Sequence, residues 1–384
     1  MRRLRVLFIP EWYPTVVNPA CGAYVKDHAK AVAQYDDVVV LRLPEMSHLM
    51  SGWFGMEKEE APLGFADFPT YRPFYRPLPA KLGYFTYIGA GIRAVHALMR
   101  DGWKPDVIHA HVYEAGAFAL FISKYFGIPL VITEHSVEFL RGEPQGLNRW
   151  KARLAFRWAD RVIPVTRLLQ NAITGSGLRG RFQMVPNPVD LDLFKPRSRP
   201  RIDRDQTQQI LFVGTLQHTD QKGIQYLLPS LASLCQIRLD WHLNIVGGGP
   251  ALAEFQGMAH NLGLDSRVTF HGVKTRAEIA AFMQQASFFV FPSSYETFGC
   301  VLVEALASGL PAVAARVGVA EEVVTAVSGM LVPPRDVRSL TVALDKMLAT
   351  VEDYVPEAIA DCVQRFECQA VGKQLHAIYA EILK

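Results

Sequence analysis

The sequence predicts an α/β protein built from two Rossmann-like, doubly wound domains. Three observations lead to this class. The chain has 384 residues, too many for one ordinary core and suited to two domains of roughly 190 residues each. Short buried-strand patterns alternate with helical apolar stripes in both halves, as in sheets covered by helices. A polar, proline-rich segment, Lys195–Pro200, separates the halves and is typical of a linker. We therefore expect domains over residues 1–195 and 201–365.

Composition indicates the class of protein and its compartment. Apolar residues make up 50% of the chain and the mean hydropathy is +0.10, as expected of a soluble protein with large cores. The basic start Met1–Ile9 resembles a signal peptide, but its apolar run stops at Pro10 and fits a buried first strand. We find no stretch of about 18 uncharged apolar residues, so no membrane-spanning helix is expected. The five cysteines form no CxxC pair and predict a reduced, cytoplasmic protein without structural zinc.

Positive charge is concentrated in one segment. The formal charge is +3 overall, but nine Arg or Lys residues against two acids give +7 between Arg141 and Arg181. Tryptophans are interleaved with these charges, and we expect the cluster on one helix. Such a helix favours an anionic membrane surface or an acidic acceptor, and an ordinary solvated face is the alternative. No nucleic-acid recognition motif accompanies the charge, so nucleic acid is not an expected partner. The residues expected to meet a membrane are Arg149, Lys151, Arg153 and Arg157.

The first domain opens with a strand at Arg5–Pro10, followed by a loop and a helix. Gly22 at the end of this loop would let the backbone approach a ligand closely, or would form an ordinary turn. After a second strand, residues 46–76 have no clear period and predict an insertion with short strands. Residues 77–100 carry the apolar stripe of a core helix, with membrane contact as the alternative.

Histidines mark the ends of two further strands. The strand over 106–111 carries His109 and His111, two residues apart, so both side chains face the same side. A metal site would need a third ligand, and we find none at suitable spacing. The strand over 129–133 ends in a polar triplet that includes His135, at the position where doubly wound sheets bind ligands. A hydrogen-bonded core histidine is the alternative for His135.

The second half repeats the α/β pattern. A strand over 209–213 is followed by Lys222 and Gly223, just before an apolar helix. A lysine at a helix start can bind a phosphate to which backbone N–H groups already point, and a surface lysine is the alternative. Gly249 lies in a glycine turn after the next strand, which is weak evidence for a nucleotide pocket by itself. Further strands are expected at 268–273 and 287–291, and helices at 336–350 and 369–383.

Two glutamates follow the strand that ends at Phe291. Glu296 lies in the loop after this strand, and Glu304 lies inside the next helix. Eight residues at about 1.5 Å per helical residue separate the carboxylates by up to roughly 12 Å. That distance is too wide for an acid and base acting on one bond. It suits the two polar ends of one extended ligand around an anion at the helix start, and two solvent-facing glutamates are the alternative.

These motifs resemble retaining nucleotide-sugar glycosyltransferases of the GT-B fold, most closely glycosyltransferase family 4. The segment Glu296–Val313, ETFGCVLVEALASGLPAV, is similar to the family's E-x7-E signature, with the FG, EA and G-x-P elements in place. The Trp-Tyr-Pro opening, the strand DVIHAH, the pair Lys222-Gly223 and the turn GGGP resemble other family motifs in the expected order. The resemblance covers most of the chain and is strongest in its second half.

The resemblance implies two domains facing a cleft, with the donor mainly on the second and the acceptor on the first. It also implies that a C-terminal helix, residues 366–384, packs back on the first domain. The implied catalytic residues are His135, Lys222 and Glu296. The implied donor-binding residues are Gly22, Thr215, Lys222, Gly249, Val273, Glu296, Phe298, Gly299, Cys300, Val301 and Glu304. The implied acceptor-side residues are His109, His111 and Tyr24.

Two positions depart from the family pattern. Thr215 stands where the family has an arginine, and a hydroxyl cannot replace that fixed bidentate cation. Stabilisation of the leaving group would then depend on Lys222, helix dipoles or another cation such as His218. Pro188 replaces the usual glycine of a second motif, so a ligand contact by Asn187 has little support.

The resemblance implies sugar transfer from a nucleoside diphosphate sugar, with UDP or GDP as the nucleotide, to an acceptor hydroxyl with retention of configuration. Positioning and stabilisation of the departing diphosphate would drive the reaction without a metal or other cofactor. The basic segment favours a lipid-linked acceptor at the inner membrane face, in polysaccharide or glycolipid assembly. The alternatives are a GT-B epimerase or phosphorylase and a non-catalytic nucleotide-sugar-binding protein.

Overall fold

A computed structural model of the chain describes residues 2–15, 21–47, 52–59, 68–78, 83–142, 144–196 and 207–384. It divides into two compact units, each described here by itself. Unit 1 consists of Met1–Pro188 and Cys368–Lys384, and unit 2 consists of Val189–Glu367. The chain therefore first passes from unit 1 to unit 2 after Pro188, seven residues before the expected end of the first domain at residue 195. Residues 197–200 of the expected linker lie outside the described residues.

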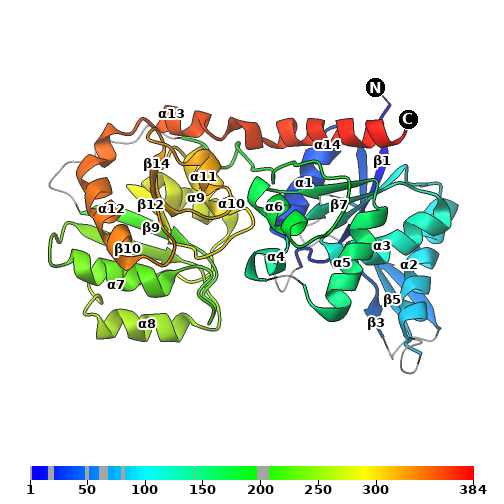
Figure 1. The fold of residues 1–384 in the computed structure, drawn as a ribbon, viewed down its shortest axis with the longest axis horizontal. Helices are drawn as coiled ribbons and strands as arrows, with labels where there is room; N and C mark the ends of the chain where they lie inside the picture. Colours follow the sequence, from blue (N-terminus) through cyan, green and yellow to red (C-terminus); the bar gives the residue numbers. More distant parts are fainter. Residues whose placement is uncertain are drawn as a thin grey trace. The chain divides into compact units, whose positions relative to one another are not determined.

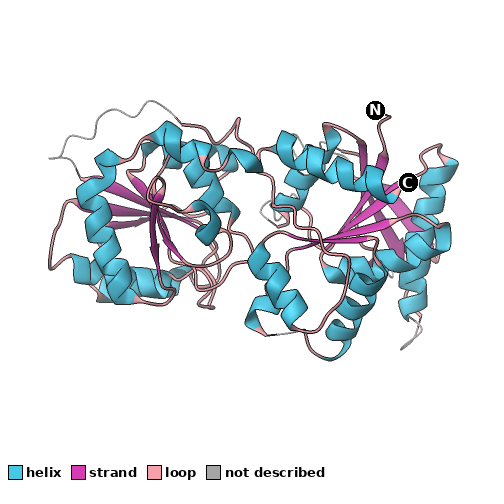
Figure 2. Ribbon diagram, turned by 45° about the horizontal axis from the view of Figure 1, so that its top comes forward, coloured by secondary structure: helices cyan, strands magenta, loops and turns pink. Residues whose placement is uncertain are grey.

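Unit 1 contains a mostly parallel sheet with helices on both faces (Figures 1 and 2). The strand order is β3-β5-β2-β1-β6-β7-β8, and β4 pairs with β5 antiparallel. The strands are β1 (Arg5–Pro10), β2 (Asp37–Leu41), β3 (Glu45–Met46), β4 (Phe54–Lys58), β5 (Thr70–Tyr75), β6 (Val107–His111), β7 (Leu130–Glu134) and β8 (Arg161–Pro164). The helices are α1 (Ala23–Ala33), α2 (Gly83–Arg100), α3 (Tyr113–Phe126), α4 (Glu138–Arg141), α5 (Gly146–Trp158), α6 (Arg167–Gly175) and α14 (Cys368–Ile382).

Unit 2 contains a six-stranded sheet in the order β11-β10-β9-β12-β13-β14, and every pairing in it is parallel. The strands are β9 (Gln208–Val213), β10 (Trp241–Val246), β11 (Val268–Phe270), β12 (Phe288–Phe291), β13 (Ala312–Ala315) and β14 (Gly329–Val332). The helices are α7 (Ile224–Leu234), α8 (Leu252–Asn261), α9 (Arg276–Gln285), α10 (Cys300–Ala307), α11 (Ala320–Val323), α12 (Val337–Thr350) and α13 (Pro356–Asp361), with short 3₁₀ turns η2 (Val351–Asp353) and η3 (Gln364–Phe366). Helices again cover both faces of the sheet (Figure 2).

Apolar strands explain why both sheets are buried. All four residues of β12 and of β13 are buried, as expected of parallel strands covered on both faces. Local signals also mark the starts of two helices in unit 2. Thr275 caps α9 and forms a capping box with Glu278, and Asp336 caps α12. Sequence patterning and local capping therefore agree in unit 2.

The C-terminal helix α14 belongs to the core of unit 1. Its residues Val371, Leu375, Ile378 and Tyr379 pack in the same buried cluster as residues of β1 and α1. At Gly372 the two helices approach closely, because an added Cβ would lie 2.1 Å from the Ala31 carbonyl oxygen. His376 Nδ1 lies 2.9 Å from the Asp36 carboxylate. Figure 1 shows α14 running beside α1 within this unit.

Three expectations change in the structure. Residues 46–76 were expected as an insertion with short strands; the strands β3, β4 and β5 are present, but they extend the main sheet beyond β2, and residues 48–51 and 60–67 lie outside the described part. The strand expected over 268–273 ends at Phe270. The basic cluster does not lie on one helix, since α5 carries four of the nine cations and the others lie on α4, β8, α6 and a loop. Among the described residues, no helix is long and apolar enough to cross a membrane.

Candidate active site

Each sheet has a topological switch point where its strand order reverses. In unit 2 it lies between β9 and β12, because β10 and β13 extend the sheet in opposite directions from this pair. In unit 1 it lies between β1 and β6. Loops at the carboxyl ends of such strand pairs separate and leave room for a ligand. The predicted site residues can therefore be located relative to these two positions.

Lys222 and Glu296 join the two loops at the switch point of unit 2. Lys222 follows β9 and Glu296 follows β12, and Lys222 Nζ donates a hydrogen bond to Glu296 Oε1. Ser293 Oγ also donates to this oxygen, at 3.4 Å. The Glu296 side chain is 8% exposed and that of Lys222 is 24% exposed. The hydrogen bond to Glu296 holds the Lys222 side chain in place. Because an ammonium has three N–H donors, Lys222 can still donate to an anion.

Two helices begin at this pair, each after a glycine with positive φ. Gly223 (φ 70°) precedes α7 and Gly299 (φ 94°) precedes α10. At Gly223 a side chain has no room, because a Cβ would lie 1.9 Å from the Pro292 carbonyl oxygen. This contact brings the α7 start against the loop that carries Glu296. Two helix N-termini and one lysine thus provide unpaired N–H donors and positive charge for a phosphate.

Glu304 lies on α10 and is held by an arginine that the sequence did not single out. Arg276, the first residue of α9, donates from Nη2 to Glu304 Oε1 at 2.9 Å. The guanidinium also lies over the Phe194 ring, 5.4 Å from its centroid. Phe194 therefore packs against Arg276 of unit 2. This agrees with the division of the chain between Pro188 and Val189, before residue 195. The available signal in the sequence was the capping-box spacing of Thr275 and Glu278, which marks a helix start but does not point to the arginine.

The remaining predicted donor residues vary in exposure. Thr215 is exposed after β9, and Val273, 73% exposed, lies beyond the end of β11. Phe298 is buried with its ring against Phe366, so only its backbone could meet a ligand. Cys300 and Val301 form the half-buried first turn of α10.

The glycine turn after β10 approaches the loop after β9. A Cβ at Gly249 would lie 2.2 Å from the Leu216 carbonyl oxygen, and Leu216 N donates to Gly248 O at 2.9 Å. The turn therefore packs directly beside Thr215. His218, considered as a substitute cation, is 63% exposed and lies 3.0 Å from Glu254, so an acid already faces it.

Four buried histidines lie together in unit 1. The rings of His109 and His111 stack with centroids 4.4 Å apart, and His111 stacks on His135 at 5.4 Å. The fourth, His28 on α1, meets His111 and His135 edge to face. Tyr24, also on α1, lies 4.5 Å from the His135 ring. The structure thus brings together the predicted residues Tyr24, His109, His111 and His135, preceded by Gly22 at the start of α1 (φ 66°).

Hydrogen bonds orient these rings. His109 lies 2.6 Å from Tyr379 Oη and 2.7 Å from Thr133 Oγ1. His111 Nδ1 lies 3.1 Å from His135 Nε2, so one ring donates to the other. His28 Nε2 lies 3.0 Å from Asn187 Oδ1, an acceptor, which places the ring proton on Nε2. Within the described residues, His111 Nε2 and His135 Nδ1 have no hydrogen-bond partner.

Burial keeps these histidines neutral. It lowers the pKa of His28 to about 4, and it lowers the pKa of His109, His111 and His135 well below the usual value. Neighbouring imidazoles act in the same direction. Neutral rings can accept or donate a hydrogen bond to a ligand hydroxyl without bringing charge to it. Within the described residues, no group of three or more His, Cys, Asp or Glu side chains is arranged to hold a metal ion.

Carboxylates at the edge of this cluster were missed by sequence reasoning. Glu11 follows β1 at the switch point, and its backbone N–H donates to His111 O at 3.2 Å. Burial, with Glu114 nearby, raises the pKa of Glu11 to about 7, while Lys151 acts in the opposite direction. Glu134 accepts from the backbone N–H groups of Tyr113, His135 and Ser136. The position of Glu11 and Glu134 at strand ends was the available signal.

The backbone beside His111 is strained. Val112 has φ 76° and ψ 146°, a conformation that a β-branched residue rarely adopts. Its N–H donates to Thr133 O at 2.8 Å, and its carbonyl accepts from Gly116 N at 2.9 Å. These bonds hold the strained residue in place between His111 and the start of α3. Strain of this kind is concentrated at functional sites.

Two family descriptions together match most of the chain. "Glycosyltransferase Family 4" matches residues 22–193, and "Glycosyl transferases group 1" matches residues 207–350. The chain is 27% identical over 401 residues to a glycogen synthase of Mycobacterium tuberculosis, covering 98% of this chain and 94% of that protein. It is 32% identical over 308 residues to a D-inositol 3-phosphate glycosyltransferase of Frankia alni, covering 71% of both chains.

Solved structures share the fold. Anabaena Alr3699/HepE, solved in complex with UDP, has a TM-score of 0.76 at 21% identity, covering 98% of this chain and all of that one. A sucrose-phosphate synthase from Thermosynechococcus elongatus has a TM-score of 0.73 at 23% identity, covering 99% of both chains. Both units of the structure thus have counterparts of known fold.

Proposed function

The chain belongs to glycosyltransferase family 4 and is a hexosyltransferase, and from this premise we propose that it uses a nucleoside diphosphate sugar as donor. The observation that carries the proposal is the Lys222–Glu296 pair at the switch point of unit 2. Lys222 and the N-termini of α7 and α10 offer donors to a diphosphate. Anabaena Alr3699/HepE has been solved with UDP and with UDP-glucose, and this supports UDP over GDP.

In the proposed reaction the bond from the anomeric carbon to the diphosphate oxygen breaks, and a bond to the acceptor oxygen forms on the same face. The acceptor proton passes to the departing diphosphate. Lys222 and the helix starts stabilise the developing negative charge. Glu296 holds Lys222 and meets the donor sugar, and Glu304, oriented by Arg276, meets the ribose hydroxyls. No metal or cofactor is needed in this scheme.

The acceptor side is proposed to be the histidine cluster of unit 1. His135 would meet the transferred sugar, and His109, His111 and Tyr24 would shape the acceptor pocket. The support is the position of His111 and His135 at the carboxyl ends of β6 and β7, the neutral state of their rings, and the packing of Tyr24 and His109 against them. Glu11 joins them as a carboxylate able to accept from an acceptor hydroxyl.

We also propose that the protein works in the cytoplasm at the inner membrane face, on a lipid-linked acceptor of polysaccharide or glycolipid assembly. None of the five cysteines, all of them described, forms a disulfide, as in reducing compartments. Trp150 and Trp158 on α5 are 55% and 54% exposed, and exposed tryptophan beside arginine suits a membrane interface. Lys151, included in the expected membrane surface, instead lies near Glu11 and Glu114.

The first test is a thermal-shift panel of nucleotides and nucleotide sugars in EDTA, followed by turnover with the donor that binds. UDP and one UDP-sugar should raise the melting temperature. Lys222→Ala should lose this shift and lower kcat/KM by about 10²-fold or more, as for other single groups that stabilise transition-state charge. Lys346→Ala, an exposed change on α12 in the same unit, should behave as wild type.

Product analysis separates the remaining possibilities. NMR of the product should show the donor's anomeric configuration. Release of free sugar without acceptor would indicate an epimerase, and donor binding without any turnover would indicate a binding protein. A full UDP-sugar shift in Lys222→Ala would contradict the assigned diphosphate site.

A further inference from the structure

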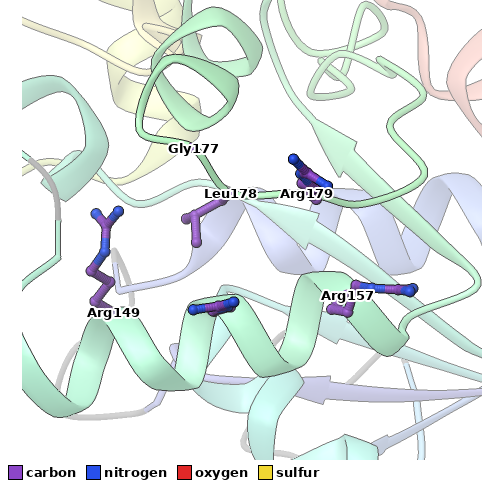
Figure 3. Close-up of a pocket in the computed structure, with 6 residues that line it drawn as sticks. Arg149, Arg157, Gly177, Leu178 and Arg179 are labelled. Atoms are coloured by element: carbon purple, nitrogen blue, oxygen red, sulfur yellow. The ribbon is translucent and has the colours of Figure 1, made fainter.

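A cavity of about 450 Å³ in unit 1 is lined mainly by arginine. Its walls are α5 on one side and the loop after α6 on the other. The lining residues are Arg149, Arg153, Arg157, Gly177, Leu178 and Arg179. Figure 3 shows Arg149 and Arg157 on the helix, with the segment of Gly177, Leu178 and Arg179 facing them. Neither the histidine cluster nor the residues around Lys222 contribute to it.

The fold holds the two walls together. Arg149, Arg153 and Arg157 are spaced four residues apart, so they lie along one face of α5. The loop is anchored by Leu178, which is 4% exposed, and by Arg149 Nη2, which donates to Ser176 O at 2.8 Å. At Gly180 the loop passes so close to α5 that a Cβ would lie 3.0 Å from the Phe156 carbonyl oxygen. The cavity is therefore formed without a ligand.

The cavity is strongly positive, because four arginines line it. Among the described residues, no carboxylate lies within ion-pair distance of Arg153, Arg157 or Arg179. The adjoining hollow adds Lys124 and Arg181. Its one acid, Asp160, already accepts from Leu130 N at 2.9 Å. Like charges held this close repel one another, and a bound anion would remove that repulsion.

We propose that this cavity binds a ligand through phosphate groups. Guanidinium groups present planar, paired N–H donors that match phosphate oxygens, and several of them around one hollow suit a diphosphate or a phosphate ester. The site is distinct from the donor site, which lies in unit 2. It is also distinct from the acceptor pocket. Lys151 marks the side of α5 nearest that pocket, because it interacts with Glu11 and Glu114. Arg149, two residues earlier, projects from the helix about 200° away from Lys151.

Two sources could supply such a phosphate. One is a soluble phosphorylated compound, and the other is the headgroup of an anionic lipid, for which the exposed Trp150 and Trp158 flank the site. Both use the same guanidinium chemistry. The two arms of the experiment below distinguish them.

The first arm titrates the full-length protein with inorganic pyrophosphate by calorimetry. Arg153→Gln with Arg157→Gln should weaken one binding component at least tenfold, whereas Lys222→Ala should leave that component unchanged. Arg153→Lys with Arg157→Lys keeps the charge but loses the paired donors, and should lie in between. The matched control is Arg2→Gln with Arg100→Gln, which removes two exposed charges of unit 1 outside the cavity and should bind as wild type.

The second arm measures co-sedimentation with phosphatidylglycerol vesicles and with phosphatidylcholine vesicles. Binding to the anionic vesicles that is lost in the double glutamine variant and displaced by pyrophosphate would assign the site to a lipid headgroup. Pyrophosphate binding without vesicle binding would assign it to a soluble phosphate. The proposal is overturned if the double glutamine variant matches wild type in both arms, or if Lys222→Ala removes all pyrophosphate binding.

Discussion

His28 is a base buried in its neutral form, and this links the stability of unit 1 to pH. Burial lowers its pKa to about 4, below the unfolded value near 6.5. The unfolded chain therefore binds a proton at a pH where the folded protein does not. The stabilisation is complete above about pH 6.5 and is lost as the pH falls toward 4.

We predict that wild type loses about 3 kcal/mol of unfolding free energy between pH 7 and 4 through His28 alone. The other three buried histidines act in the same direction. His28→Gln keeps a donor for Asn187 but cannot titrate, so its stability should fall less with pH. Urea unfolding at four pH values measures this, with exposed His260→Gln as control. If the unfolding free energies of wild type and His28→Gln fell equally with pH, the attribution of this loss to His28 would be refuted.

Gly223 gives a second residue-scale prediction. Gly223→Ala forces a Cβ into a left-handed backbone and against the Pro292 carbonyl oxygen, and should destabilise unit 2 by about 2 kcal/mol. Gly257→Ala is the matched control in the same unit. It lies within α8 with no atom within 4 Å of the added Cβ, so it should stabilise by about 0.5–1 kcal/mol. The urea midpoint should fall in Gly223→Ala and rise in Gly257→Ala. Equal changes of the midpoint in the two variants would contradict the steric argument.

Individual site residues differ in how far the sequence could identify them. Lys222, Glu296 and His135 lie within motifs that resemble those of a family, and that resemblance singled them out. Arg276, His28 and Glu11 do not. Their importance comes from partners distant in sequence: Glu304 for Arg276, Asn187 for His28 and Glu114 for Glu11. Only the folded chain brings these pairs together.

At the scale of elements, α14 contributes buried side chains to unit 1 far from their neighbours in sequence. Leu375→Ala removes a fully buried side chain from the cluster shared with α1 and β1. It should destabilise unit 1 by about 2–5 kcal/mol. Gln374→Ala, the exposed neighbour on the same helix, should change stability by less than about 0.5 kcal/mol.

Thermal and urea unfolding measure this difference, and donor binding by unit 2 is the second readout. If Leu375→Ala weakened donor binding while leaving unit 1 stable, α14 would have a different role from the one described. Equal effects of Leu375→Ala and Gln374→Ala would likewise contradict it.

Helices and strands with a clear period were predicted well, because burial of one face determines them. Strand β5 was harder, because β5 and its antiparallel partner β4 both lie within residues 46–76, which have no clear period. The basic segment was also misjudged. Its cations were expected on one helix, but α5 ends at Trp158 and the strand β8, which the sequence did predict, begins at Arg161.

At the scale of the whole molecule, the chain passes from unit 1 to unit 2 and returns. The first passage, at Pro188–Val189, is close to a proline-rich stretch that indicated a boundary. The return at Glu367–Cys368 has no such signal, since η3 leads almost directly into α14. Family resemblance, not residue pattern, was the basis for predicting the return.

This return determines the order in which the units can fold during synthesis. The ribosome makes all of unit 2 before it makes Val371, Leu375, Ile378 and Tyr379, which complete the core of unit 1. Unit 1 therefore cannot complete its core before the last residues of the chain have left the ribosome. A released chain truncated after Glu367 should therefore resist protease in unit 2 and remain sensitive in unit 1, which makes the first half of the protein the expected client of chaperones.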